Sequence, residues 1–85
     1  MKEDAAERSA QYVEKASQSL KRLKLRNSLA TASSSNIEHV LELAREYVKD
    51  AKHYADEKKP VTSLACVSYA EGLLDAMKFL ELVDF

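Results

Sequence analysis

The chain has 85 residues, of which 46% are hydrophobic and 32% are charged, and this length predicts one small domain spanning residues 1–85. Thirteen basic and fourteen acidic side chains leave a net charge of -1, which argues against a protein that neutralises a nucleic-acid backbone. One cysteine excludes a disulfide framework and a multi-cysteine zinc site, and one glycine and one proline exclude glycine-rich phosphate loops and turn-dense β folds.

The first predicted element is a helix from about residue 4 to residue 24. Apolar and small side chains recur there at helical spacing, and Asp4 stands where an N-cap is needed. Residues 25–35 then lose both charge and periodicity, and we expect them to form a connector.

Two further helices are predicted at 36–57 and 60–82. Ser35-Asn36-Ile37-Glu38 reads as a capping box that opens the second helix, and a sustained apolar stripe follows it. Lys58 and Lys59 suit the C-terminal end of that helix, and Pro60 suits the first position of the next. No strand is expected. The predicted fold is therefore an all-α three-helix bundle built on a tight antiparallel hairpin of helices 36–57 and 60–82.

Small residues predict how that hairpin packs. A turn centred near Lys58-Lys59 brings Ala44 level with Gly72. Small side chains at such levels would let two helix backbones approach closely, and this would compensate the cost of a glycine inside a helix. Gly72→Leu is then expected to lower the melting temperature, whereas the alternative is that Gly72 opens space for a ligand. The predicted contact residues are Val40, Ala44, Ala51, Ala65, Gly72 and Ala76.

The helix at 60–82 has more apolar surface than a small bundle needs. Its polar side chains occupy a narrow arc, and the segment after it stays largely apolar. The surplus is expected to meet either the first helix or another subunit, so a homodimer or another protein partner is predicted. The candidate interface residues are Val67, Ala70, Leu74, Met77, Phe79, Leu82 and Phe85. Tyr47, Tyr54 and Tyr69 are interpreted as the edge of the core, with the rim of a partner-binding groove as the alternative.

The stretch Ser68-Tyr69-Ala70-Glu71-Gly72-Leu73-Leu74-Asp75-Ala76, together with Leu43-Ala44, Tyr47, Asp50-Ala51 and Tyr54, is similar to the signature of a small archaeal family. The family is catalogued as domain of unknown function three hundred and fifty-seven. The resemblance covers about residues 36–80 and implies a short helical bundle of archaeal, cytosolic origin, with no established activity. Members tend to have a glycine in the turn where this chain has Glu57-Lys58-Lys59-Pro60.

Catalytic and metal chemistry find little support in the sequence. Glu71 and Asp75 lie one helical turn apart, and a carboxylate metal or small-ligand site there is a further alternative function. The expected register does not bring His53 beside them, and both His39 and His53 point away from the apolar stripe of their helix. Cys66 and His53 are nearly level across the hairpin yet lie on different helix faces, so no nucleophile is predicted. We therefore expect no enzymatic activity and no cofactor.

A second functional hypothesis rests on the basic end of the first helix. Lys21, Arg22, Lys24 and Arg26 form a cluster that could bind an anion or RNA, although the side chains are spread around the helix instead of forming one stripe. Nucleic-acid binding is accordingly a minor alternative to protein interaction. The charge also changes along the chain, from +3 over residues 1–35 to -3 over residues 60–85, which would suit either antiparallel self-association or the docking of the first helix on the third.

No segment is apolar for long enough to cross a membrane, and the charged residues at 1–4 are not followed by an apolar signal core. These features predict a cytoplasmic protein without membrane contact. The sequence as a whole favours a non-enzymatic module for protein interaction or homo-oligomerisation.

Overall fold

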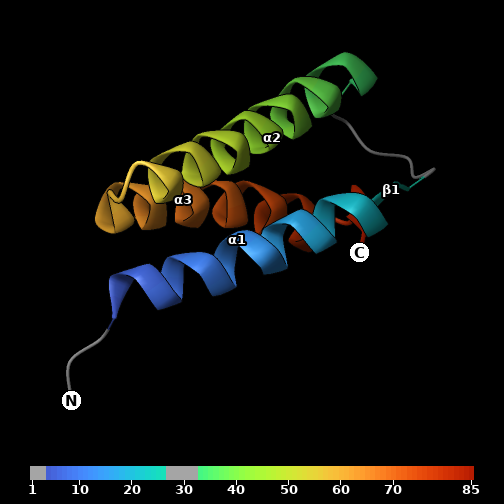
Figure 1. Ribbon diagram of the computed structural model, residues 1–85. Helices are drawn as coiled ribbons and strands as arrows, with labels where there is room; N and C mark the ends of the chain where they lie inside the picture. The colour runs from blue at the N-terminus through green and yellow to red at the C-terminus, as the bar shows by residue number, and fades with distance from the viewer. Residues whose placement is uncertain (1–3, 27–32) are drawn as a thin grey trace.

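Three helices make up most of residues 4–26 and 33–85, the part of the chain that this computed structural model describes. They are α1 (Ala5–Arg22), α2 (Ser34–Asp56) and α3 (Pro60–Phe79). Figure 1 shows them running alongside one another, and the molecule measures 45 × 24 × 17 Å. The contact between α2 and α3 is the most extensive, and α1 packs against both. The predicted all-α bundle, with an N-terminal helix on a helical hairpin, is confirmed.

The helices begin at residues that satisfy their free backbone amides. Asp4 caps α1, because its Oδ1 accepts hydrogen bonds from the amides of Ala6 at 2.9 Å and Glu7 at 3.3 Å. The cap of α2 is Ser33, whose Oγ accepts from the amide of Asn36 at 3.2 Å. The predicted capping box beginning at Ser35 is therefore wrong by two residues. A run of three serines offers the same hydroxyl at each position, and the extended backbone of Ser33 selects the first of them.

Both long helices of the hairpin end in the same hydrogen-bonded reversal. After α2, Lys58 takes a positive φ of 61° while its amide donates to the carbonyl of Ala55 at 3.1 Å. After α3, Glu81 takes a φ of 59°, and the amide of Leu82 donates to the carbonyl of Met77 at 2.9 Å. This is the Schellman arrangement, in which a left-handed residue returns the chain across the last turn. The reversal ends α3 at Phe79, so the predicted extension to residue 82 is wrong.

Two short strands correct the expectation that the chain forms none. β1 (Lys24–Leu25) and β2 (Val83–Asp84) pair antiparallel, with Lys24 opposite Asp84 and Leu25 opposite Val83. The amide of Arg26 extends the pairing by donating to the carbonyl of Leu82 at 2.9 Å. The strand pair joins the end of α1 to the segment after α3. Of the predicted connector 25–35, residues 27–32 lie outside the described part of the chain.

The core consists of one stripe from each helix, and its residues recur at spacings of three and four. Such spacing is typical of helices that pack along a common seam. Leu82 and Val83 close one end of the core, where they contact Leu41, Leu74 and Met77. The buried residues are Ser9, Ala16 and Ser19 in α1, Leu41, Ala44, Val48 and Ala51 in α2, and Ser63, Val67, Ala70, Leu74 and Met77 in α3.

The structure reverses the two sides that the sequence assigned to α3. Residues of α2 and α3 lie level with each other as the sequence predicted, since the tilted rings of Tyr47 and Tyr69 have centroids 4.6 Å apart. Ala44 and Ala51 are also buried on α2 as predicted, and Val40 is half-buried. However, Ala65, Gly72 and Ala76 are exposed, and a Cβ added at Gly72 would meet nothing within 4 Å. The predicted small-residue contact through these three residues is therefore wrong.

The predicted interface residues lie mainly in the core. Val67, Ala70, Leu74, Met77 and Leu82 are buried, and Phe85 is half-buried. Of that set, only Phe79 is exposed. The reason is that α3 is apolar around most of its circumference, so periodicity alone does not reveal which side faces the bundle. The buried stripe of α3 is the one that contacts both α1 and α2.

Candidate functional site

The charged side chains of α3 all lie on the side next to α1. The helix has only three of them within Pro60–Phe79, namely Glu71, Asp75 and Lys78. Glu71 and Asp75 line a small cavity against α1, and the ammonium of Lys78 lies 4.7 Å from the ring centroid of Phe85, which lines the same cavity. The remainder of α3 is consequently free of charge.

The side of α3 that faces away from the buried stripe is exposed and uncharged, and we call it the outer face. At 100° per residue its members fall within an arc of about 120°. Four of them are large: Phe79 is 80% exposed, Val61 71%, Leu80 69% and Tyr69 57%. The outer face consists of Val61, Thr62, Ala65, Ser68, Tyr69, Gly72, Ala76 and Phe79, followed by Leu80 at the helix end.

An apolar groove of about 320 Å³ borders the outer face on the side of α2. Leu73 and Ala76 form its α3 wall, and Ile37 and Val40 form its α2 wall. The stacked rings of Tyr47 and Tyr69 continue this surface along the hairpin. The alternative interpretation of these tyrosines, as part of a rim instead of the core edge, fits Tyr69, because more than half of its surface is exposed.

Cys66 is half-buried and packs against the core cluster that includes Val48 and Val67. Burial raises the pKa of its thiol, and the nearby carboxylate of Asp50 raises it further. A raised pKa keeps the thiol protonated and therefore weakly nucleophilic. His53 does not assist it, because the Nε2 of His53 lies 3.0 Å from the Oε1 of Glu57 on the exposed side of α2.

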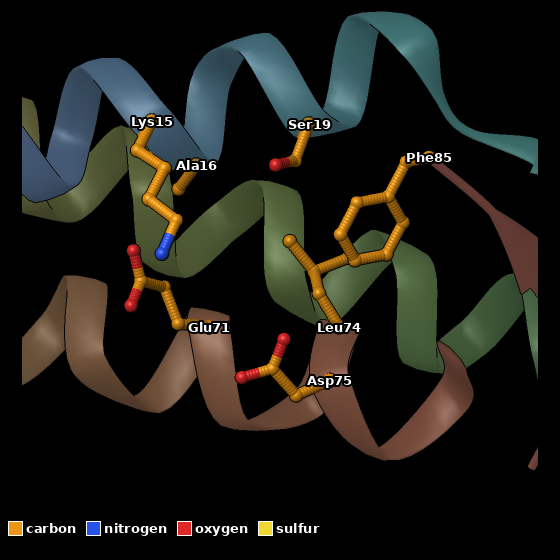
Figure 2. Close-up of a pocket in the computed structure, with 7 residues that line it drawn as sticks. All are labelled: Lys15, Ala16, Ser19, Glu71, Leu74, Asp75 and Phe85. Atoms are coloured by element: carbon orange, nitrogen blue, oxygen red, sulfur yellow. The ribbon is translucent and has the colours of Figure 1, made fainter. Parts of the chain in front are cut away.

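Glu71 is a half-buried carboxylate in the cavity between α1 and α3. Figure 2 shows the ammonium of Lys15 directed toward its carboxylate, with Asp75 below and Phe85 to one side. The Oε1 atom of Glu71 is buried and has no hydrogen-bond partner. Burial raises the pKa of Glu71, and Asp75 adds to this rise while Lys15 opposes it. The cavity has a volume of about 30 Å³, which is enough for one water molecule.

The structure offers little for a metal at Glu71 and Asp75. Among residues 4–26 and 33–85, no group of three or more His, Cys, Asp and Glu side chains converges on a common point. The ammonium of Lys15 in α1 is directed toward the carboxylate of Glu71. A cation at this position competes with a metal ion for the same carboxylate.

The four basic residues at the end of α1 are all exposed, as expected for an anion-binding cluster. Two of them face an acidic neighbour across the strand pair. Lys24 is opposite Asp84, and the Nε of Arg26 lies 3.7 Å from the Oδ2 of Asp84. Asp84 reduces the positive potential there, so nothing in the geometry favours the anion hypothesis, which stays a prediction for Lys21, Arg22, Lys24 and Arg26.

Sequence reasoning missed Val61 and Leu80, and it placed Gly72 on the wrong side of α3. The signal that could have identified them is the placement of charge. The three charges of α3 fall in one arc that separates two apolar stripes; one stripe is buried against α1 and α2, and the other stays in solvent.

A family model described as "Protein of unknown function (DUF357)" matches residues 11–83. No curated protein and no solved structure shows significant similarity to the chain. Within the described residues, none of the helices combines the length and the apolar character that a membrane span requires.

Proposed function

The chain belongs to the DUF357 family, whose description assigns no function, and we propose that it is a non-enzymatic interaction module that binds a protein surface through the outer face of α3. The proposal retains the interaction role expected from the sequence and moves it to the opposite side of the helix. The single observation that carries it is the continuous, uncharged and solvent-exposed outer face.

The physical argument is the cost of leaving such a face in water. Each Å² of apolar surface removed from water contributes roughly 25 cal/mol. Single exposed apolar residues are normal on a monomer, but contiguous apolar patches usually mark interaction sites. Phe79, Leu80, Val61 and Tyr69 share one face of one helix, and no charged side chain interrupts them. A partner that covers this face would gain the energy that the monomer cannot.

The chemistry of the surrounding side chains also supports a binding role. The raised pKa of Cys66 disfavours the reactive thiolate. The groove itself is lined by aliphatic side chains and Asn36. Such a lining suits the apolar side chain of a partner better than a reacting substrate, which needs convergent polar groups.

Site-specific photo-crosslinking in the native cell tests the proposal. The photoreactive amino acid p-benzoylphenylalanine would replace Phe79 or Tyr69, because both are exposed aromatic residues of the outer face. The matched control is the same replacement at Gln11, which is exposed on α1. We expect protein adducts at Phe79 and Tyr69 and few or none at Gln11. Adducts at the two α3 positions that do not exceed the Gln11 control would overturn the proposed function.

A further inference from the structure

We infer that the partner covering the outer face is a second copy of this chain, with the two α3 helices packed antiparallel about a twofold axis at Gly72. The inference rests on the proposed function, because it names the occupant of the same face. It is carried by two independent features of α3, namely the order of side-chain sizes along the outer face and the distribution of charge at the two ends of the helix.

The outer face is self-complementary in size when the helix is reversed. In an antiparallel pair centred on Gly72, residues equally far before and after it come level with each other. Phe79 is seven residues after Gly72 and Ala65 seven residues before it. The most exposed ring of one copy therefore meets a methyl group of the other, twice in each dimer. Ser68 and Ala76 each lie four residues from Gly72, and their small side chains let the two helices approach closely near the centre of the pair.

Gly72 fits the centre of such a pair. A glycine inside a helix costs about 1 kcal/mol relative to alanine, and no contact within the chain explains its presence, because a Cβ there would meet nothing within 4 Å. On a twofold axis the same residue would meet itself. Two glycines at the crossing point let the helix axes approach to the short end of the range of about 8–10 Å.

Charge at the ends of α3 selects the antiparallel orientation. Lys58 and Lys59, which follow Asp56 and Glu57 in the chain, precede the helix, and Glu81 follows it. In the antiparallel pair, Glu81 of one copy lies level with the first turn of α3 in the other copy, within about one helical turn of Lys59. That first turn has no side-chain cap, and its free amides favour an anion. A parallel pair would instead bring the two Lys58-Lys59 pairs together at one end and the two Glu81 side chains together at the other.

The centre of the outer face adds no electrostatic repulsion between the two copies. Between Val61 and Phe79 the outer face carries no charge, so pairing neither buries a charged group nor brings like charges together. The three charged residues of α3 remain on the side of α1. An unrelated protein would need to supply this same order of sizes and charges, whereas a second copy supplies it by symmetry.

Sedimentation equilibrium of the purified full-length chain over a range of concentrations tests the pairing. We expect a reversible monomer–dimer equilibrium for the natural sequence. Gly72→Glu would bring two carboxylates together on the axis, and we expect it to raise the dimer Kd by roughly 100-fold or more. The matched control, Gln11→Glu, adds the same charge to α1 and should leave the Kd unchanged. Circular dichroism should show equal helix content for both variants, because Gly72 has open space around it.

Single-cysteine variants in a Cys66→Ser background test the orientation. Gly72→Cys should form a covalent dimer under mild oxidation, because position 72 meets itself. Ala65→Cys alone and Phe79→Cys alone should not, but an equimolar mixture of the two should crosslink. Gln11→Cys serves as the control for random collisions.

The two proposals fail in different ways. If the purified chain sediments as a monomer throughout and Gly72→Cys crosslinks no faster than Gln11→Cys, the self-pairing is wrong. Photo-adducts at Phe79 that contain a different protein would then leave the proposed function intact. Efficient crosslinking by Ala65→Cys alone would show a parallel pair and overturn the antiparallel arrangement.

Discussion

At the level of single residues, a chain of buried hydroxyls joins all three helices. The Oγ of Ser63 donates to the carbonyl of Ala51 at 2.6 Å, so its other partner, the Oγ of Ser9 at 2.5 Å, must be the donor in their hydrogen bond. Ser9 and Ser63 are both buried. The hydroxyls thus link α1, α3 and α2 at a level where the side chains are too small for large apolar contacts.

Removing one hydroxyl of this chain should therefore cost stability. We expect Ser63→Ala to lower the free energy of unfolding by about 1–2 kcal/mol, because it leaves the Ser9 hydroxyl buried without a partner. The double variant Ser9→Ala/Ser63→Ala should cost less than the sum of the two single changes, since no orphan remains. Urea unfolding measures all three, with Ser68→Ala at an exposed position as the control. Equal midpoints for Ser63→Ala and Ser68→Ala would contradict the structural role of the hydroxyl.

Glu71 provides a pH-dependent test of the cavity between α1 and α3. Burial raises its pKa in the folded state, so the folded protein holds this proton more tightly than the unfolded chain. The stability that the group contributes is full at low pH and is lost as the pH rises through the raised pKa. Glu71→Gln should thus become more stable relative to the natural sequence as the pH rises from about 4 to 7.

The measurement for Glu71 is the difference in unfolding free energy between the two proteins at several pH values. The control is Glu38→Gln, which makes the same chemical change at an exposed position of α2. A difference for Glu71→Gln that is constant with pH, or that shrinks as the pH rises, would show that attraction to Lys15 outweighs the burial of the carboxylate.

Gly72 shows what the sequence could and could not predict about a single residue. Its unusual cost inside a helix was evident from the sequence, and so was its level opposite Ala44. The side of α3 on which Gly72 lies was not evident from the sequence, because it depends on which of the neighbouring stripes the bundle buries. With open space around Gly72, the melting temperature of the monomer should not fall in Gly72→Leu, contrary to the expectation from the sequence.

At the level of helices and turns, the reversal after α2 predicts a stabilising substitution. Lys58 holds a φ of 61°, a left-handed conformation that favours glycine. We expect Lys58→Gly to raise the free energy of unfolding by about 1 kcal/mol, because it removes the clash of the Cβ atom with the backbone. Thermal unfolding measures the change. The control is Lys59→Gly, where the φ of -115° suits any residue and glycine should give no gain.

The helices were predictable from sequence because their signals are local. Asp4 and Pro60 mark helix starts through their own backbone and side-chain chemistry, and the observed bounds lie within about two residues of those expected, apart from the end of α3. The strand pair was not predictable in this way. A strand of two residues has no periodicity, and the pairing of Leu25 with Val83 joins segments far apart in the chain.

The predicted end of α3 was wrong for a related reason. The apolar run continues past Phe79, so the pattern extends the helix, whereas the chain reverses at Glu81, a residue with no particular preference for a positive φ. Burial of Leu82 and Val83 at the end of the core compensates that conformation. The tertiary contact, which the sequence does not display, decides where the helix stops.

At the level of the whole molecule, the excess of apolar surface on α3 was correctly expected and was placed on the wrong side. The bundle needs one apolar stripe on α3 to contact α1 and α2, and Val67 and Leu74 belong to it. The second stripe, which includes Phe79, is left in solvent. The two stripes are similar in composition, so their different roles must appear in how substitutions affect stability.

Phe79 of the outer face and Val83 of β2, which packs in the same core cluster as Leu74, test this division of roles. Val83 is 1% exposed in the core cluster, whereas Phe79 is 80% exposed on the outer face. We expect Val83→Ala to lower the free energy of unfolding by about 1–3 kcal/mol, because it removes buried methyl groups and leaves a cavity at the end of the bundle. Phe79→Ala removes a larger side chain, yet it should change the stability of the monomer by less than about 0.5 kcal/mol.

Urea unfolding at a protein concentration low enough to avoid association separates the two substitutions. Raising the concentration should then reveal a cost for Phe79→Ala alone, because pairing through the outer face stabilises the folded state by mass action. Val83→Ala should show the same deficit at both concentrations. If Phe79→Ala were as damaging as Val83→Ala in the monomer, Phe79 would belong to the core, and the outer face would lose its largest exposed side chain.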